Sequence, residues 1–169
     1  MIALLMGVCG SGKTTIGRAL ADGLGWPFLD ADDFHPAANV ARMAAGTPLT
    51  DEDRWPWLDR LAEEMCSILA RGGSAVVACS ALKHAYRDRL RAGIANVGEL
   101  RLVHLNGDFA TIAARLAARQ HRYMPATLLA SQFATLEPPL DALVVDIAQP
   151  IPDQVAAIRA ALASTPVTP

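Results

Sequence analysis

The run GVCGSGKT at residues 7–14 has the composition and spacing of a loop that binds phosphate groups. It matches the pattern of Gly, any four residues, Gly-Lys-Ser/Thr at every fixed position. The glycines let the backbone turn so that several N–H groups point at one anion, and the amino terminus of a following helix adds partial positive charge. We therefore expect a nucleotide site here. The residues expected to hold it are Gly7, Gly10, Ser11, Gly12, Lys13, Thr14 and the next helical residue, Thr15.

Two side chains of this loop predict its chemistry. Lys13 is expected to reach the β- and γ-phosphates, and the Thr14 hydroxyl is expected to bind Mg²⁺. The alternative is a glycine-rich turn that only joins a strand to a helix. Because the run lies between an apolar segment and an amphipathic one, the context favours the nucleotide site, with ATP and Mg²⁺ as cofactors.

Acidic residues follow the second expected strand. Asp30 and Asp32 lie where that strand should end, with Asp33 beside them, and ligands of open α/β sheets bind at the carboxyl ends of strands. On an extended segment this spacing places the first two carboxylates on the same side. Asp32 is the candidate base for an acceptor hydroxyl, and Asp30 the candidate partner of the metal and its water shell. A solvated turn or helix cap is the alternative, and it suits Asp33 best.

Polar and cationic residues gather in two further segments, one before and one after the third expected strand. Several cations and hydrogen-bond donors there would suit a small, polyhydroxylated, anionic acceptor. Taken singly, Arg42 and Arg91 also fit exposed helix positions, and Trp55 and Trp57 fit the core better than a ligand stack. The candidate acceptor residues are His35, Asn39, Arg42, Arg54, Lys83, Tyr86, Arg87 and Arg91.

A basic stretch with Arg115, Arg119 and Arg122 follows the fourth expected strand, between Gly107 and Pro125. Cations on a mobile lid can close over the phosphates, exclude water and stabilise the charge of the transition state. The alternative is a helix carboxyl terminus with favourable Arg placement. We expect Arg119 to be the lid cation and to act in catalysis as well as in nucleotide binding.

Apolar runs and amphipathic segments alternate along the chain, which predicts the elements that position these residues. Strands are expected at residues 2–8, 28–30, 75–79, 100–105 and 143–147. A helix is expected after the phosphate loop, through Ile16, Leu20 and Leu24, and others near residues 36–46, 50–71, 83–91, 108–119, 126–134 and 152–163. This alternation predicts an α/β fold: a doubly wound, five-stranded parallel sheet flanked by helices, with a small lid. We expect one domain over residues 1–164, a lid over about 119–126 and a disordered tail at 165–169.

The bulk composition excludes several classes of protein. A formal net charge of −2 argues against a nucleic-acid or membrane-surface binder. The three cysteines have no CxxC spacing, so neither a zinc site nor a disulfide framework is expected. No segment has the charge pattern of a signal peptide or the length of a membrane span, so a cytoplasmic location is expected.

The chain also resembles the gluconate kinase family, within the P-loop enzymes similar to shikimate and nucleoside-monophosphate kinases. The resemblance covers nearly all of residues 3–152. Its first motif, LLMGVCGSGKTT, is common to many nucleotide-hydrolysing proteins, whereas the combination of the others is much narrower. The other motifs are FLDADDFHP followed by Asn39 and Met43, then GTPLTDEDRWPWL, CSALKHAYRDRLR, LNGDF, SQFATLEPP and VVDIAQP.

The resemblance implies transfer of the ATP γ-phosphate to the 6-hydroxyl of D-gluconate, by a protein that is commonly a homodimer. Arg119 would lie near the nucleotide, and Gln149 and Pro150 near the adenine. The chain departs from the family in its lid, because Arg122 stands where the family has His and His121 falls one place early. The residues that the resemblance places around gluconate are Asp32, His35, Arg54, Lys83 and Arg87.

Two other functions compete with this one. A shikimate or nucleoside-monophosphate kinase would share the phosphate loop, but shikimate kinases typically carry a glycine-rich run where this chain has Cys79-Ser80-Ala81-Leu82-Lys83. A nucleotide-dependent regulatory module would need a segment that senses the nucleotide and a partner surface, and the sequence suggests neither.

Overall fold

The computed structural model describes residues 1–118 and 126–164. Its centre is a five-stranded sheet with the order β2-β3-β1-β4-β5, in which every neighbouring pair is parallel. This confirms the expected fold class. The strands are β1 (Ile2–Met6), β2 (Phe28–Asp30), β3 (Ala75–Ala78), β4 (Leu100–Asn106) and β5 (Leu143–Asp146).

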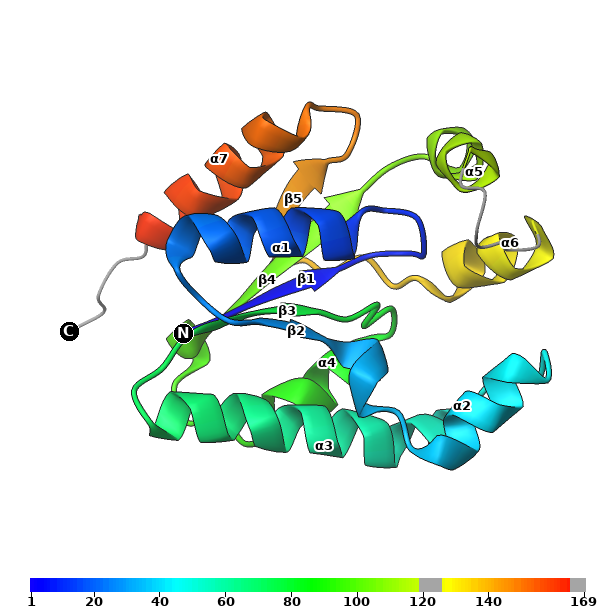
Figure 1. Ribbon diagram of the computed structural model, residues 1–169, viewed down its shortest axis with the longest axis horizontal. Coiled ribbons are helices and arrows are strands. Elements are labelled where there is room, and N and C mark those ends of the chain that lie inside the picture. The colour runs from blue at the N-terminus through cyan, green and yellow to red at the C-terminus, as the bar shows by residue number, and fades with distance from the viewer. Residues whose placement is uncertain (119–125, 165–169) are drawn as a thin grey trace.

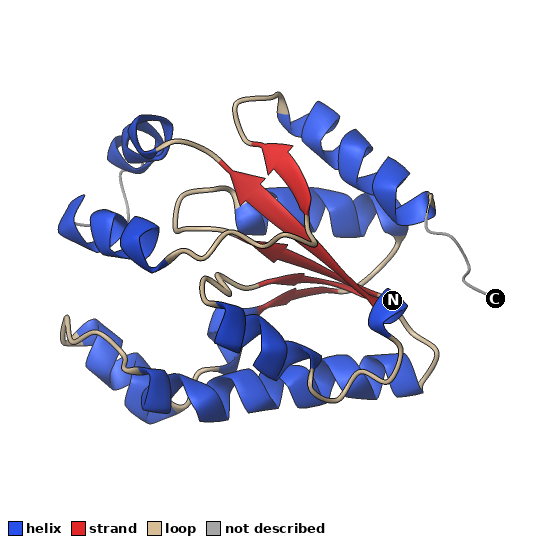
Figure 2. Ribbon diagram, turned by 180° about the vertical axis from the view of Figure 1, so that it is seen from behind, coloured by secondary structure: helices blue, strands red, loops and turns tan. Residues whose placement is uncertain are grey.

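Helices cover both faces of the sheet and its carboxyl end (Figures 1 and 2). α1 and α7 lie on one face, α3 and α4 lie on the other, and α5 and α6 stand beyond the arrowheads of the strands. The helices are α1 (Lys13–Leu24), α2 (Ala37–Ala44), α3 (Asp51–Ala70), α4 (His84–Arg91), α5 (Phe109–Ala117), α6 (Ala126–Thr135) and α7 (Ile151–Ala163), with short 3-10 turns η1 (Ala31–Phe34) and η2 (Val97–Glu99). No described helix is both long enough and apolar enough to cross a bilayer.

Side-chain alternation along β1 divides the core into two layers. Ile2, Leu4 and Met6 pack with buried residues of α3 and α4, whereas Ala3 and Leu5 pack with those of α1, α5 and α7. A central strand buried on both faces must be apolar throughout, which explains the continuous run at the start of the chain. Because β1 packs against both layers, the first residue of the loop that follows it is held in place.

The strand order brings two functional loops together at the carboxyl end of the sheet. β1 lies next to β3, and the loops that follow them are bonded to each other. The Cys79 N–H donates to the Leu5 carbonyl at 3.0 Å, and the Gly7 N–H donates to the Ser80 carbonyl at 3.3 Å. The phosphate loop and the loop before Lys83 therefore share one support.

The expected bounds of the elements needed small corrections. β1 ends at Met6 rather than at Val8, because Gly7 turns the chain with φ +143° and a side chain there would lie 2.8 Å from the Leu105 carbonyl oxygen. The two 3-10 turns were not expected. The tail at 165–169 lies outside the described residues.

Candidate active site

The phosphate loop has the backbone conformation of an anion-binding turn. Gly10 and Gly12 have φ values of +85° and +100°, which favour glycine, and Gly12 directly precedes the first residue of α1. Lys13 Nζ donates to the Gly7 carbonyl at 2.9 Å and to the Val8 carbonyl at 3.1 Å. Burial lowers the pKa of Lys13, and nearby Asp32 and Asp30 act in the opposite direction. The lysine is therefore folded back across the loop, where a phosphate would meet it.

A buried hydroxyl at this loop fits a phosphate ligand. Ser11 Oγ is inaccessible and has no hydrogen-bond partner among the described residues. A buried polar group without a partner costs free energy. A phosphate held by the loop would supply an acceptor for this hydroxyl, so the residues present fit a nucleotide.

A hollow of about 300 Å³ adjoins the loop and extends toward α7. Its rim is ordered by side chains that bond the segment before α7: Arg115 Nη2 donates to the Ile147 carbonyl at 2.5 Å, and Gln154 Nε2 donates to the Gln149 carbonyl at 2.7 Å. The hollow is lined by Ser11, Gly12, Thr15, Ile16, Arg115, Ala118, Ile151 and Gln154. Gln149 and Pro150, expected near the adenine, are exposed at this same segment.

Thr14 and Asp30 come together across the carboxyl ends of β1 and β2. Thr14 Oγ1 donates to Asp30 Oδ2 at 3.1 Å. No group of three or more His, Cys, Asp or Glu side chains within residues 1–118 and 126–164 could enclose a metal ion. A hydroxyl and one carboxylate instead match Mg²⁺, which keeps several waters and shares ligands with substrate phosphates.

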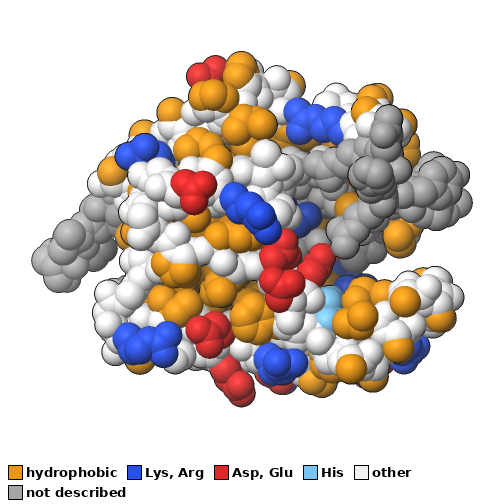
Figure 3. Space-filling model, in the orientation of Figure 1, with side chains coloured by type: hydrophobic (Ala, Val, Ile, Leu, Met, Phe, Trp, Pro, Cys, Tyr) orange, Lys and Arg blue, Asp and Glu red, His pale blue; other side chains and the backbone are white. Residues whose placement is uncertain are grey.

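Asp30 and Asp32 do not share one extended segment, so the expected placement of both carboxylates by strand spacing is wrong. β2 ends at Asp30, and Asp32 lies in η1, because Asp30 Oδ1 caps that turn by accepting the Asp32 N–H at 3.2 Å. Asp32 is nevertheless exposed at the same edge of the sheet, close enough to oppose the lowered pKa of Lys13 and of His35. Acidic side chains gather in this part of the surface in Figure 3.

His35 is held by an aromatic stack beside Asp32. Its ring lies 4.1 Å from that of Trp57, with an interplanar angle of 18°. Trp57 is itself buried and donates from Nε1 to the Ala31 carbonyl at 2.6 Å, which confirms it as a core residue. Burial lowers the pKa of His35, with Arg54 acting in the same direction and Asp32 against it. His35 therefore stands ready as a neutral hydrogen-bonding group.

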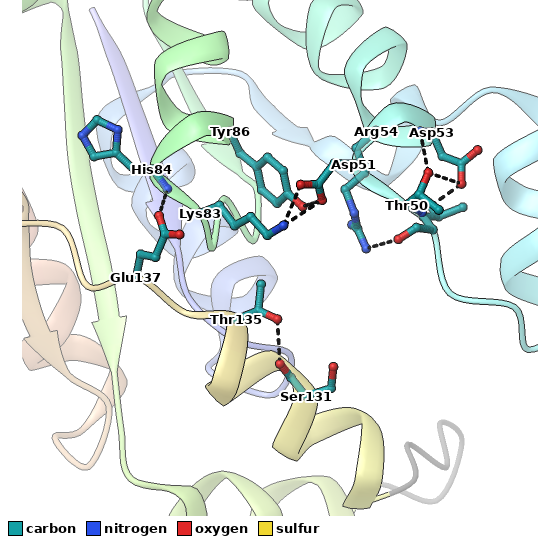
Figure 4. A network of polar contacts seen from close by, with 11 residues as sticks. Thr50, Asp51, Asp53, Arg54, Lys83, His84, Tyr86, Ser131, Thr135 and Glu137 are labelled. Carbon is teal, nitrogen blue, oxygen red and sulfur yellow. Dashed lines mark hydrogen bonds and ion pairs between the residues drawn. The ribbon is translucent and has the colours of Figure 1, made fainter.

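Lys83 lies in a network that sequence reasoning only partly foresaw (Figure 4). Its Nζ bonds both oxygens of Asp51, at 2.6 and 2.9 Å, and Tyr86 Oη donates to Asp51 Oδ1 at 2.5 Å. These bonds, that from Lys83 first, lower the pKa of Asp51. Arg54 stands beside them, over the Tyr86 ring at 5.8 Å, and donates to the Leu49 carbonyl at 3.2 Å. Asp51 was expected only in the first turn of a helix, and nothing in the local sequence relates it to Lys83.

Arg87, expected to contact the acceptor, is buried behind the loop that carries Lys83. Its Nη1 donates to the Ala81 carbonyl at 3.0 Å and to the Leu82 carbonyl at 3.1 Å. Ala81 has φ +43°, an unfavourable conformation for a residue with a side chain. In this geometry Arg87 supports the strained loop from within the protein.

The remaining candidate residues lie outside the network around Lys83. Arg42 is exposed and pairs with Asp53 at 2.8 Å, and Arg91 pairs with Asp141 at 2.5 Å. Asn39 is buried and donates to the Asp53 carbonyl at 2.7 Å. The expected lid cation Arg119, together with Arg122, lies outside the described residues, as does the expected lid except for the residue that begins α6.

A buried histidine behind the site predicts how stability depends on pH. His104 of β4 lies in the core, and burial, followed by the charge of Arg87, lowers its pKa below the ordinary 6.5. The unfolded chain thus binds more protons in acid, so the free energy of unfolding should fall as pH drops below about 6.5. Urea denaturation at pH 7.5 and 5.5 measures this change. His104→Leu should reduce the pH dependence; an equally steep dependence in that variant would contradict the assignment.

Comparisons with known proteins identify relatives of this chain. The AAA domain family matches residues 2–139. A probable gluconokinase of Xenopus tropicalis is 47% identical over 151 residues, covering 82% of this chain and 80% of its own length. The thermosensitive gluconokinase of Escherichia coli (strain K12) is 47% identical over 136 residues, covering 80% and 71%. The crystal structure of a gluconokinase from Sinorhizobium meliloti 1021 superposes with a TM-score of 0.85 at 42% identity, covering 95% of this chain and 90% of that one.

Proposed function

The chain belongs to the gluconokinase family, and on this premise we propose that it phosphorylates D-gluconate at its 6-hydroxyl with ATP as phosphoryl donor. The observation that carries the proposal is the meeting of three features at one edge of the sheet. The phosphate loop, the Thr14–Asp30 pair and the cationic network around Lys83 all lie at the carboxyl ends of β1, β2 and β3. A phosphoryl donor and an anionic acceptor can therefore approach each other across this edge.

The proposed donor site consists of the phosphate loop and the adjoining hollow. Backbone N–H groups and Lys13 hold the phosphates. Thr15 lines the hollow that would receive the rest of the nucleotide. Arg119 closes over the nucleotide, and Gln149 and Pro150 flank the adenine. Mg²⁺, bound by the Thr14 hydroxyl and near Asp30, would neutralise charge on the β- and γ-phosphates. The residues present fit this ion because they offer oxygen ligands and leave positions for water.

The proposed acceptor site faces the donor site from η1, α3 and the loop after β3. Asp32 orients the 6-hydroxyl and accepts its proton, and His35 beside it supplies a neutral hydrogen-bonding group. Arg54 and Lys83 attract the carboxylate and hydroxyls of gluconate. Lys83 already forms an ion pair with Asp51, so the acceptor either replaces Asp51 as the partner of Lys83 or binds beside the pair. Arg87 acts on the acceptor through the loop that it supports.

Asp30→Asn should raise the Mg²⁺ concentration needed for half-maximal activity. The substitution removes a negative charge from the position that Thr14 Oγ1 contacts, while an amide oxygen remains to cap η1. We expect an increase on the order of tenfold, as for loss of one interaction worth about 1.4 kcal/mol. Titration of activity with Mg²⁺ at saturating ATP measures it. Asp22→Asn, an exposed change on α1, is the control; an unchanged requirement in Asp30→Asn would remove Asp30 from the metal site.

Three further properties complete the proposal. Residues 1–164 form one kinase domain with a lid over about 119–126. The protein acts as a homodimer in the cytoplasm. No nucleic acid or membrane takes part, in keeping with the formal net charge of −2.

A panel of acceptors tests the proposed function. ADP release is measured with gluconate, related aldonates, shikimate and nucleoside monophosphates at equal concentrations. The proposal expects kcat/KM for gluconate to exceed that for shikimate and for every nucleotide by at least about 1000-fold, since a site built to hydrogen-bond particular hydroxyls rejects ligands that leave its polar groups unpaired. Preference for shikimate or a nucleotide would replace gluconate with that acceptor.

A further inference from the structure

The segment Gln132–Glu137, named here the bridge, contacts both functional loops at once. It comprises the last turn of α6 and the two residues after it. At one end the Cys9 N–H of the phosphate loop donates to Gln132 Oε1 at 2.6 Å. At the other end the Glu137 N–H donates to the Leu82 carbonyl at 2.9 Å, and a carboxylate oxygen of Glu137 accepts the His84 N–H.

Gln132 contacts the part of the phosphate loop that lies before Gly10 and Gly12. Lys13 Nζ donates to the Gly7 and Val8 carbonyls, so the lysine already holds the two residues before Cys9. The Cys9 N–H donates to the Gln132 carboxamide oxygen, on a side chain 123 residues away in sequence. A bond of this length between half-buried groups fixes Cys9 relative to α6.

The Glu137 end fixes the residue on which the acceptor network depends. The Leu82 carbonyl accepts both the Glu137 N–H and the Arg87 guanidinium, and His84 begins α4. Lys83 lies between these two anchored residues, as the residue before α4. The Glu137 carboxylate also suits the amino terminus of that helix and acts on Arg87, whose lowered pKa it opposes. Figure 4 shows Glu137 reaching the backbone beside Lys83 from the end of α6.

The bridge is too short and too well packed to stretch between its ends. The Leu136 N–H donates to the Gln132 carbonyl at 3.0 Å, so the two anchors are separated by little more than one helical turn. Leu136 packs against both layers of the core. The distance between Cys9 and Lys83 is therefore set through the bridge as well as through the direct bond between Gly7 and Ser80.

We propose that Gln132 and Glu137 are positioning residues, which together hold the phosphate loop and the Lys83 loop at the spacing that in-line phosphoryl transfer needs. The inference rests on the proposed function. Because a misplacement of about 1 Å can cost about 100-fold in rate, the effect should fall on kcat more than on either KM. Since the bridge works only when both ends are attached, breaking one end should cost nearly as much as breaking both.

A double-mutant cycle tests this coupling. We would measure kcat and the KM values for ATP and gluconate in the wild type, Gln132→Ala, Glu137→Ala and the double variant. The concentration of active protein in each sample is determined by titration with nucleotide. Each single change should lower kcat by about 10- to 100-fold, and the double variant should match the worse single one. Ser131→Ala, an exposed change on the same helix, should behave like the wild type. Glu137→Gln, which keeps an acceptor for the His84 N–H, should recover most of the lost kcat.

The outcomes separate the inference from the function on which it rests. Multiplying losses in the double variant would mean two independent local roles and would overturn the bridge, as would unchanged kcat or a loss confined to one KM. If an alanine variant fails to fold, Gln132→Asn and Glu137→Asp, which only shorten the side chains, carry the same cycle with the same criteria. Wild-type protein without gluconate-dependent turnover would instead overturn the proposed function.

Discussion

Asp32→Asn is expected to lower kcat by at least about 100-fold with gluconate as acceptor, because loss of a general base typically costs about 100- to 10,000-fold. The amide keeps the size of the carboxylate but accepts no proton at neutral pH. Asp32 is exposed in η1, so the substitution leaves the core untouched. The KM for ATP should change little, since the phosphate loop has its own ligands for the nucleotide.

The neighbouring carboxylate provides the matched control for this experiment. Asp33 lies in the same 3-10 turn, is also exposed and carries the same charge. Asp33→Asn should retain kcat within about twofold, as is usual for a surface substitution. Steady-state kinetics on both variants separates a specific base from a general effect of charge at this edge. A near-normal kcat in Asp32→Asn would refute the assignment of Asp32.

Lys13→Ala is expected to reduce kcat/KM for ATP on the order of 100- to 1000-fold or more, the cost of removing one aligned donor from a transition state that develops charge. Lys13 Nζ lies across the phosphate loop, within hydrogen-bond distance of the Gly7 and Val8 carbonyls. A phosphate bound in the loop would accept hydrogen bonds from Lys13 Nζ in place of these carbonyls. The affinity for ATP, measured by titration calorimetry, should fall together with kcat/KM.

A second cation of the same helix controls for the loss of charge. Arg18 is exposed on α1, and its guanidinium lies over the Phe28 ring at 5.6 Å. Arg18→Ala should change kcat/KM for ATP by no more than about threefold. If Lys13→Ala retained wild-type activity, the proposed nucleotide site would fall, and the proposed function with it.

The features that could be predicted from sequence are those encoded by local patterns. A continuous apolar run followed by the phosphate-loop motif predicted β1 and α1, and alternation of segments predicted all five strands of the sheet. A helix was expected from residue 50, and α3 begins at Asp51, where Thr50 and Asp53 form a reciprocal cap. In each case the residues that decide the outcome lie within one or two turns of each other.

Long-range partners and competing local bonds account for what was missed. Asp51 contacts Lys83 across 32 residues and Gln132 contacts Cys9 across 123, separations that no local pattern constrains. Asp32 is not extended because its N–H donates to the Asp30 carboxylate, a local bond that competes with strand geometry. The charge of Arg87 suits an anionic acceptor, but its Nη1 donates to the carbonyl of Ala81, whose backbone is strained.

We propose that the phosphoryl group held at the phosphate loop is delivered to a gluconate hydroxyl. Phosphorus NMR of a reaction with ATP, Mg²⁺ and gluconate measures this directly, since the ester, ADP and free phosphate give separate signals. We predict one 6-phosphogluconate formed for each ADP, with no ester when gluconate is omitted. ADP that accumulates with free phosphate alone, or at the same rate without gluconate, would contradict the claim.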